Sequence, residues 1–173
     1  MTTSVRVLAG ILLASGCGGV VAEQPLTIPL GIDRLAADAQ LQHHKYCHKV
    51  DGPRVEVETY PRCDRTGTEW GESWVQAHYD DKNKLVELRR YERYSDEAHA
   101  TERWNQLVAE RGKLGVEGGE AATALRAKLL EHGTRAVKAF RIDASTVVGV
   151  YLLTPKPPED ASILEAVIMI PKP

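Results

Sequence analysis

The 173-residue sequence lacks the features that most directly reveal a protein's surroundings. No apolar run approaches the roughly 20 residues that a helix needs to span a bilayer. Neither charge sign is in clear excess, because 22 basic residues stand against 24 acidic ones, a formal net charge of -2. A chain so close to neutral has no electrostatic footprint for nucleic acid, so we expect no nucleic-acid partner. The hydrophobic share of 43% and the charged share of 27% are ordinary for a globular protein and exclude wholesale disorder.

Recognisable catalytic motifs are missing as well. The sequence contains no CxxC, CxxCH or zinc-knuckle spacing. The stretch GESWV at 71–75 begins like a nucleophile elbow, but Val75 stands where a second glycine is needed to relieve crowding. Gly118 and Gly119 are not followed by the Lys-Ser/Thr pair of a phosphate-binding loop. The sequence therefore names no reaction, and we predict neither catalytic residues nor a cofactor.

The first segment of the chain decides which residues remain in the mature protein. Arg6 precedes an apolar run at 7–14, and small residues follow it, which is the order of a secretory signal peptide. The ending LASGC at 13–17 resembles the lipobox of bacterial lipoproteins. The resemblance implies that residues 1–16 are a signal peptide and that Cys17 becomes the first mature residue, acylated at its sulfur by lipid chains such as palmitate.

Gly18 and a second cleavage motif bear on the location of the mature protein. Gly18 after the lipid-bearing cysteine resembles lipoproteins sorted to the outer membrane of diderm bacteria, which implies a lipid-anchored protein facing the periplasm. An alternative stays open. Val20-Val21-Ala22 before Glu23 is a small-x-small site for ordinary signal peptidase, and cleavage there would release a soluble exported protein without Cys17.

The two remaining cysteines, Cys47 and Cys63, form an even pair in an oxidising compartment. We predict that they form a disulfide. A closed loop of this length stabilises a domain by about 3 kcal/mol, because it restricts the unfolded chain. The alternative is a pair of buried thiols.

Turn formers and hydrophobic periodicity predict the organisation of the rest. Residues 17–31 are interrupted by Gly and Pro and show no sustained hydrophobic period, so we interpret them as a tether. One domain follows at 32–173. The predicted elements are a helix from Asp33 to about residue 45, a strand at 55–60 ended by Pro61, a hairpin of 73–79 and 84–94, a helix capped by Ser95 and ended by Gly112, a loop at 115–119, a helix at 120–132, a hairpin of 135–143 and 146–153, and a final strand at 163–170.

This order predicts an α+β fold: a single domain with an antiparallel sheet of five to seven strands and two to three helices packed on one face. In the first helix, Ile32, Leu35, Ala36 and Ala39 recur at helical spacing and are the expected apolar face. The runs at 147–153 and 166–170 are almost continuously apolar, so we expect these two strands to be central.

Three groups of residues are candidate sites. His44 and His48 are four residues apart and are weak candidates for a metal site, with a solvated histidine cluster as the alternative. The strand at 87–93 is strongly charged and reads as a solvated edge strand, or as a docking edge whose arginines meet an acidic partner or peptidoglycan. Tryptophans beside His78 could form a small pocket, although tryptophans are more often core residues. The candidate binding surface comprises Trp70, Trp74, His78, Arg89 and Tyr91.

Taken together, the sequence favours a non-enzymatic, membrane-anchored accessory or scaffold subunit of an envelope assembly serving secretion, motility or outer-membrane upkeep. It leaves two alternatives open. One is a ligand-binding or small enzymatic periplasmic domain, with or without a metal, and the other is an immunity or inhibitor protein.

Overall fold

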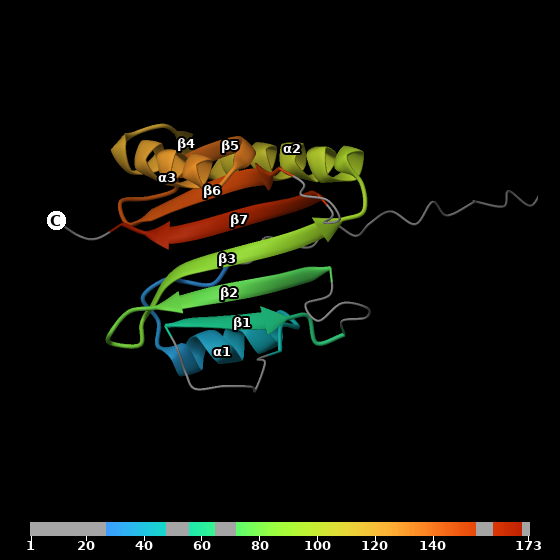
Figure 1. Ribbon diagram of the computed structural model, residues 1–173. Helices are drawn as coiled ribbons and strands as arrows, with labels where there is room; N and C mark the ends of the chain where they lie inside the picture. Colours follow the sequence, from blue (N-terminus) through green and yellow to red (C-terminus); the bar gives the residue numbers. More distant parts are fainter. Residues whose placement is uncertain (1–26, 48–55, 65–71, 155–160, 171–173) are drawn as a thin grey trace, which may run out of the picture.

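Seven antiparallel strands form one twisted sheet in the order β1-β2-β3-β7-β6-β5-β4 (Figure 1). The computed structural model of the protein describes residues 27–47, 56–64, 72–154 and 161–170. The predicted α+β class, with one sheet and three helices, is confirmed. The elements are α1 (Arg34–His43), β1 (Val57–Pro61), β2 (Ser73–Tyr79), β3 (Leu85–Tyr94), α2 (Glu97–Leu114), β4 (Val116–Glu117), α3 (Glu120–Glu131), β5 (Thr134–Arg141), β6 (Thr146–Leu153) and β7 (Ala161–Met169).

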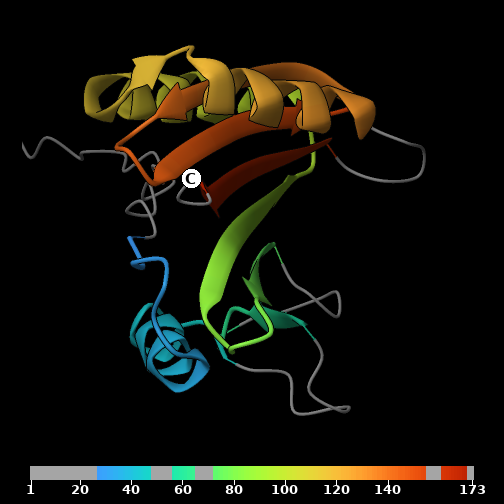
Figure 2. The ribbon, with the colours of Figure 1, turned by 90° about the vertical axis from the view of Figure 1, so that its left-hand side faces the viewer.

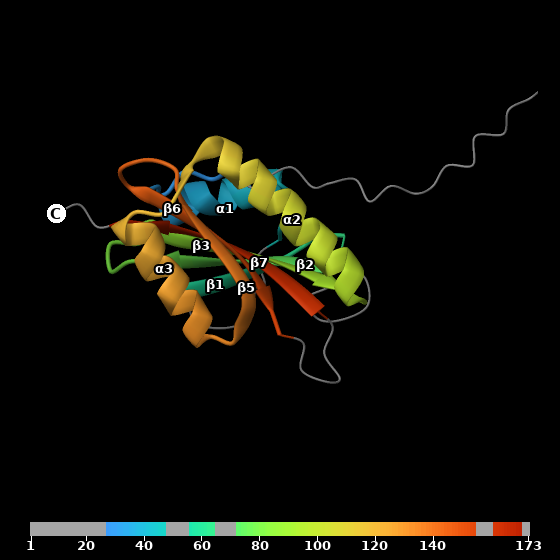
Figure 3. The same cartoon turned by 90° about the horizontal axis from the view of Figure 1, so that it is seen from above.

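The helices do not share one face of the sheet, which corrects the sequence-based prediction. Leu107 of α2 packs with Val148 and Val150 of β6. Leu125 of α3 packs with Val147, which points to the opposite side of the same strand. Seen from above, β5 and β6 pass between α2 and α3 (Figure 3). The continuous apolar run of β6 explains this arrangement, because both of its faces must be covered.

The helix α1 lies on the same face as α2. The core cluster beneath α1 includes Leu88 of β3. Leu88 lies opposite Val167 of β7, and Val167 lies opposite Val148 of β6, which packs under α2. Residues directly opposite each other in neighbouring strands share a face. We call this side of the sheet the α1 face and the other side the α3 face. Figure 2 shows α1 beside β1–β3, well separated from α3.

The apolar face predicted for the first helix is wrong at Leu35, Ala36 and Ala39, whereas Ile32 packs against the core as predicted. Leu35 is 78% exposed, and Ala36 and Ala39 are also exposed, whereas the buried residues are Arg34, Ala37 and Leu41. Arg34 is buried because its guanidinium donates to Glu58 on β1, 2.8 Å away. A charged pair therefore occupies a position at which a sequence pattern expects an apolar residue.

The predicted edge strand is also misplaced, because β3 is central and pairs with β2 on one side and β7 on the other. Its charges are tolerated there because Glu87 pairs with Arg89, and Glu92 pairs with Arg90 and Arg103. The turn before it forms as predicted: the Asp80 carboxylate accepts from the backbone N–H groups of Lys82 and Lys84 at 2.9 and 2.8 Å. Such a side-chain-to-backbone turn is typical of aspartate.

Helix ends differ slightly from the prediction. The N-cap of α2 is Asp96, whose carboxylate accepts from the His99 N–H at 2.9 Å, and not Ser95. The helix continues past Gly112 to Leu114, and the predicted loop at 115–119 contains the short strand β4.

The predicted disulfide between Cys47 and Cys63 is confirmed. It joins the segment after α1 to the end of β1, where the Cys47 N–H also donates to the Pro61 carbonyl at 2.8 Å. Cys17, Trp70 and His48 lie outside the described residues. Within the described residues, no helix is both long enough and apolar enough to cross a membrane.

Candidate functional site

The α3 face is covered by a helix over only part of its width. α3 packs on β5 and β6, and among the described helices none packs over β1–β3 on this side. The strands β2 and β3 therefore present a row of half-buried, mainly polar and aromatic side chains here. We call this surface the open face, and it consists of Trp74, Gln76, His78, Glu87, Arg89, Tyr91 and Arg93.

Strand alternation explains why these residues lie together. Val75 and Ala77 point into the core under α1, so Trp74, Gln76 and His78 must point the other way. Trp74 is paired with Tyr91, and Gln76 with Arg89. The register of one hairpin thus builds the whole surface.

A stack of three side chains occupies one end of the open face. The rings of Trp74 and Tyr91 are nearly parallel, at 4°, with centroids 5.0 Å apart. The Arg93 guanidinium carbon lies 5.2 Å from the centroid of the Trp74 ring, a cation–π arrangement. The Tyr91 hydroxyl donates to the side-chain oxygen of Gln76 at 2.9 Å. Tyr91 and Arg93 both contact the Trp74 ring, which limits the flat aromatic surface left for a ligand.

Charged groups converge at the other end. Glu87 accepts a hydrogen bond from Arg89 and lies 3.8 Å from the Lys128 ammonium of α3. His78 lies directly opposite Glu87 in the register. Burial lowers the pKa of His78; Glu87 opposes this shift, and the positive charges of Arg89 and Lys128 add to it. His78 is therefore held mainly as the neutral imidazole near neutral pH.

The structure brings together four of the five residues predicted as a binding surface, namely Trp74, His78, Arg89 and Tyr91. The weak metal site predicted at His44 and His48 is not tested, because His48 lies outside the described residues. His44 is the C-cap of α1, and its ring packs edge-on against that of His43 at 5.7 Å. Among the described residues, no three side chains of His, Cys, Asp or Glu come close enough to hold a metal ion.

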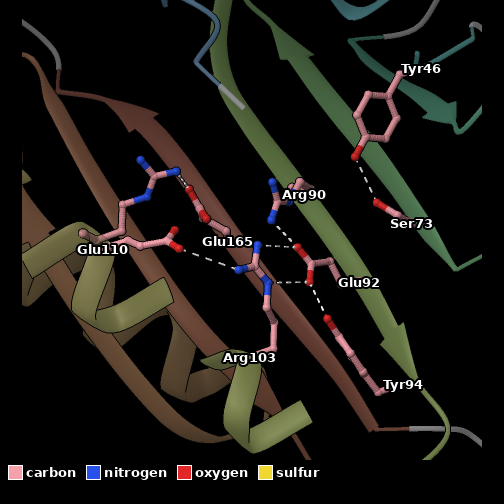
Figure 4. Close-up of polar contacts among 9 residues, drawn as sticks. Tyr46, Ser73, Arg90, Glu92, Tyr94, Arg103, Glu110 and Glu165 are labelled. Atoms are coloured by element: carbon pink, nitrogen blue, oxygen red, sulfur yellow. Dashed lines mark hydrogen bonds and ion pairs between the residues drawn. The ribbon is translucent and has the colours of Figure 1, made fainter. Parts of the chain in front are cut away.

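A second polar group lies buried on the α1 face, and the sequence analysis missed it. Glu92 of β3 accepts from Arg90 and from Arg103 of α2, with 3.1 Å to the Arg103 Nε (Figure 4). Arg111, two turns further along α2, donates to Glu165 of β7. We call these five residues the ion network, and all of them are buried.

A signal for this network is present in the helix sequence. Positions 100, 103, 107 and 111 form the buried stripe of α2, and two of the four are arginines. Arginine at a core position of an amphipathic helix requires a buried anion. Glu92 of β3 and Glu165 of β7 supply these anions from the α1 face of two central strands.

The electrostatics of the ion network are those of a structural element. Burial raises the pKa of Glu92, but Arg90 and Arg103 outweigh it, so that the pKa lies below its usual value. Burial and the neighbouring Glu92 raise the pKa of Tyr94, whose hydroxyl donates to Glu92 at 2.8 Å. Glu92 therefore stays ionised and Tyr94 stays neutral, which suits a structural contact between α2 and the sheet.

A further buried polar group lies under α1. The Tyr60 hydroxyl donates to the Glu58 carboxylate at 2.7 Å and also contacts Asp38. Arg34 covers the ring of Tyr79 at 4.4 Å. Burial raises the pKa of Tyr79 to about 12, and burial likewise raises that of Tyr60. Both phenols therefore stay neutral and serve as hydrogen-bond partners within the core.

Of these three polar groups, the open face is the one whose side chains reach the surface, and it is the candidate functional site. In comparisons with known proteins, the chain gives no significant match to a family model, a curated protein or a solved structure.

Proposed function

We propose that this protein is a lipid-anchored domain of the bacterial envelope that acts as a non-enzymatic accessory or scaffold subunit and holds a protein partner against the open face. The observation that carries the proposal is the open face itself. It is a rigid sheet surface with Trp, Tyr and Arg side chains, the residue types enriched among binding hot spots.

The disulfide supports export, because such bonds persist in oxidising compartments. The lipobox-like ending at Cys17 supplies the anchor. The chain from Cys17 to Thr27, where the described structure begins, can span at most about 35 Å when fully extended. A domain on such a short tether stays near the membrane surface and is placed to meet partners there.

The anchor can be tested by measuring the intact mass of the full chain after expression in a diderm bacterium and extraction from membranes. We expect a mature N-terminus at Cys17 carrying acyl chains. We also expect Cys47 and Cys63 to resist alkylation until a reductant is added. The matched control is Cys17→Ser, which removes the lipid site but leaves the apolar run and both other cysteines intact, and it should lose the acyl mass.

Two results would contradict the proposal. A mature chain that starts at Glu23 without lipid would make the protein a freely diffusing exported domain. Retention of Met1 with free thiols at Cys47 and Cys63 would place it in a reducing compartment.

A further inference from the structure

The charges and ring contacts of the open face indicate what kind of partner it fits. Assuming the proposed role of the open face in binding, we infer that its partner is a protein segment rich in Asp and Glu, bound through Arg89 and Lys128 beside the Trp74–Tyr91 stack.

The argument begins with the cations. Arg89 and Lys128 share one carboxylate, Glu87, so these three groups together carry one positive charge in excess. The Lys128 side chain is 50% exposed and that of Arg89 21%, whereas that of Glu87 is 13% exposed. The positive groups thus lie nearer the solvent than the negative one. His78 is mainly neutral near pH 7 and leaves this sign unchanged.

The other end of the surface is close to neutral. Arg93 stacks on Trp74, and Glu72, which precedes β2 and lies opposite Arg93 in the register, is exposed. Among the described charged residues of the open face and of its borders at Glu72 and Lys128, the cations Arg89, Arg93 and Lys128 outnumber the carboxylates Glu72 and Glu87 by one. The chain as a whole carries -2, so this surface has the opposite sign to the rest of the molecule. Complementary potentials of this kind select acidic partners and reject basic ones.

The aromatic stack favours a protein over a glycan. Sugars bind by laying a ring against the flat side of an aromatic side chain, but the Trp74 ring is contacted by Tyr91 and Arg93. Ring edges and guanidinium groups are better matched by the carboxylates and backbone of a polypeptide.

The test uses the mature full chain labelled with nitrogen-15 and a poly-L-glutamate peptide as the probe. Nuclear magnetic resonance shifts should change at residues 74–78 and 87–93, and raising the salt concentration should weaken binding. Poly-L-lysine should leave these signals unchanged. Arg89→Gln and Lys128→Gln should each bind roughly two- to five-fold more weakly, the loss usual for one solvent-accessible ion pair.

Arg126→Gln is the matched control, because it removes the same charge from an exposed position of α3 and should bind like the wild type. Lys128→Gln keeps the test valid if Arg89→Gln folds poorly. The inference is overturned if poly-L-glutamate shifts no signals of the open face, if both charged peptides act alike, or if a chitin oligosaccharide binds there instead. An acylated, membrane-bound protein that ignores poly-L-glutamate would remove this inference but leave the proposed anchored role standing.

Discussion

Two histidines, His78 and His99, experience opposite electrostatic surroundings and should therefore affect stability in opposite directions. Burial lowers the pKa of His78 in the folded protein. The hydrogen bond and the charge of Asp96 raise the pKa of His99. A lowered pKa means that the unfolded chain binds the proton more readily, so protonation favours unfolding; a raised pKa has the reverse effect.

We predict that His78→Gln flattens the loss of stability between pH 7 and pH 5. In the wild type, the contribution of neutral His78 is present above the unfolded pKa of about 6.5 and is lost as the pH falls. The measurement is the free energy of unfolding in urea at several pH values for both proteins. An identical pH slope in the two would show that His78 is not desolvated in the fold.

The His99→Gln variant gives the comparison of opposite sign. The contribution of protonated His99 is present below about pH 6.5 and is lost as the pH rises through its higher folded pKa. This variant should lose stability relative to the wild type at pH 5 more than at pH 8, although the effect is small because His99 is exposed.

Breaking the ion network should cost much more than breaking a surface pair. We predict that Glu92→Gln lowers the free energy of unfolding by about 3 kcal/mol, because Arg90 and Arg103 are left as buried charges. Glu117→Gln removes a carboxylate that is 54% exposed and lies 2.6 Å from Lys138, and it should change stability by less than about 1 kcal/mol. Urea unfolding of both variants measures the two changes in the free energy of unfolding. Equal losses of free energy would be evidence against a buried network.

The shared side of Trp74 and His78 in the candidate site was predictable from the sequence, because it depends only on the alternation of side chains along a strand. Once Val75 and Ala77 are assigned to the core, Trp74 and His78 must share the opposite side. The ion network was not predictable in the same way. Glu92 meets Arg103 only because α2 crosses the sheet above β3, a contact that strand periodicity does not specify.

At the scale of elements, the close packing of α3 on β6 depends on Gly149. A Cβ atom at Gly149 would lie 2.5 Å from Cδ1 of Leu129 and 3.1 Å from Cδ2 of Leu125. We predict that Gly149→Ala lowers the free energy of unfolding by about 1–3 kcal/mol, because α3 must move outward or its leucines must leave their rotamers. Chemical denaturation and hydrogen exchange in α3 measure the effect.

Gly112→Ala is the contrasting change, in α2. Its new Cβ would meet Cε1 of Phe140 at 3.7 Å, an ordinary contact. Alanine inside a helix is favoured over glycine by about 1 kcal/mol, so this variant should be more stable than the wild type. A stabilised Gly149→Ala, or a destabilised Gly112→Ala, would contradict the placement of these two helices.

Most element boundaries followed from turn residues, and the main error lay in how the helices are distributed. The apolar run of β6 already implied cover on both faces, which one layer of helices cannot supply. The error in α1 has another cause. Its core-facing positions include Arg34, whose partner Glu58 lies on a strand, so helical periodicity pointed to the wrong side of the helix.

At the scale of the whole molecule, the disulfide fixes α1 to the rest of the fold. Cys47 and Cys63 are 16 residues apart in sequence. The double variant Cys47→Ser, Cys63→Ser should lose about 3 kcal/mol, because the unfolded chain regains the freedom of that loop. Urea unfolding under oxidising conditions measures the loss. The wild type treated with reductant should unfold at the same urea concentration as the variant. A midpoint of urea unfolding that reductant leaves unchanged would contradict a disulfide between Cys47 and Cys63.

The place of β7 in the sheet has a consequence for the order of events during synthesis. β7 is the last of the described strands in the sequence, but it lies at the centre of the sheet, between β3 and β6. Until residues 161–169 have left the ribosome, the hairpins β2–β3 and β5–β6 have no common neighbour, and their inner edges remain unpaired. The two halves of the sheet can therefore join only after this segment has been translated, which makes closure of the sheet a late event in synthesis.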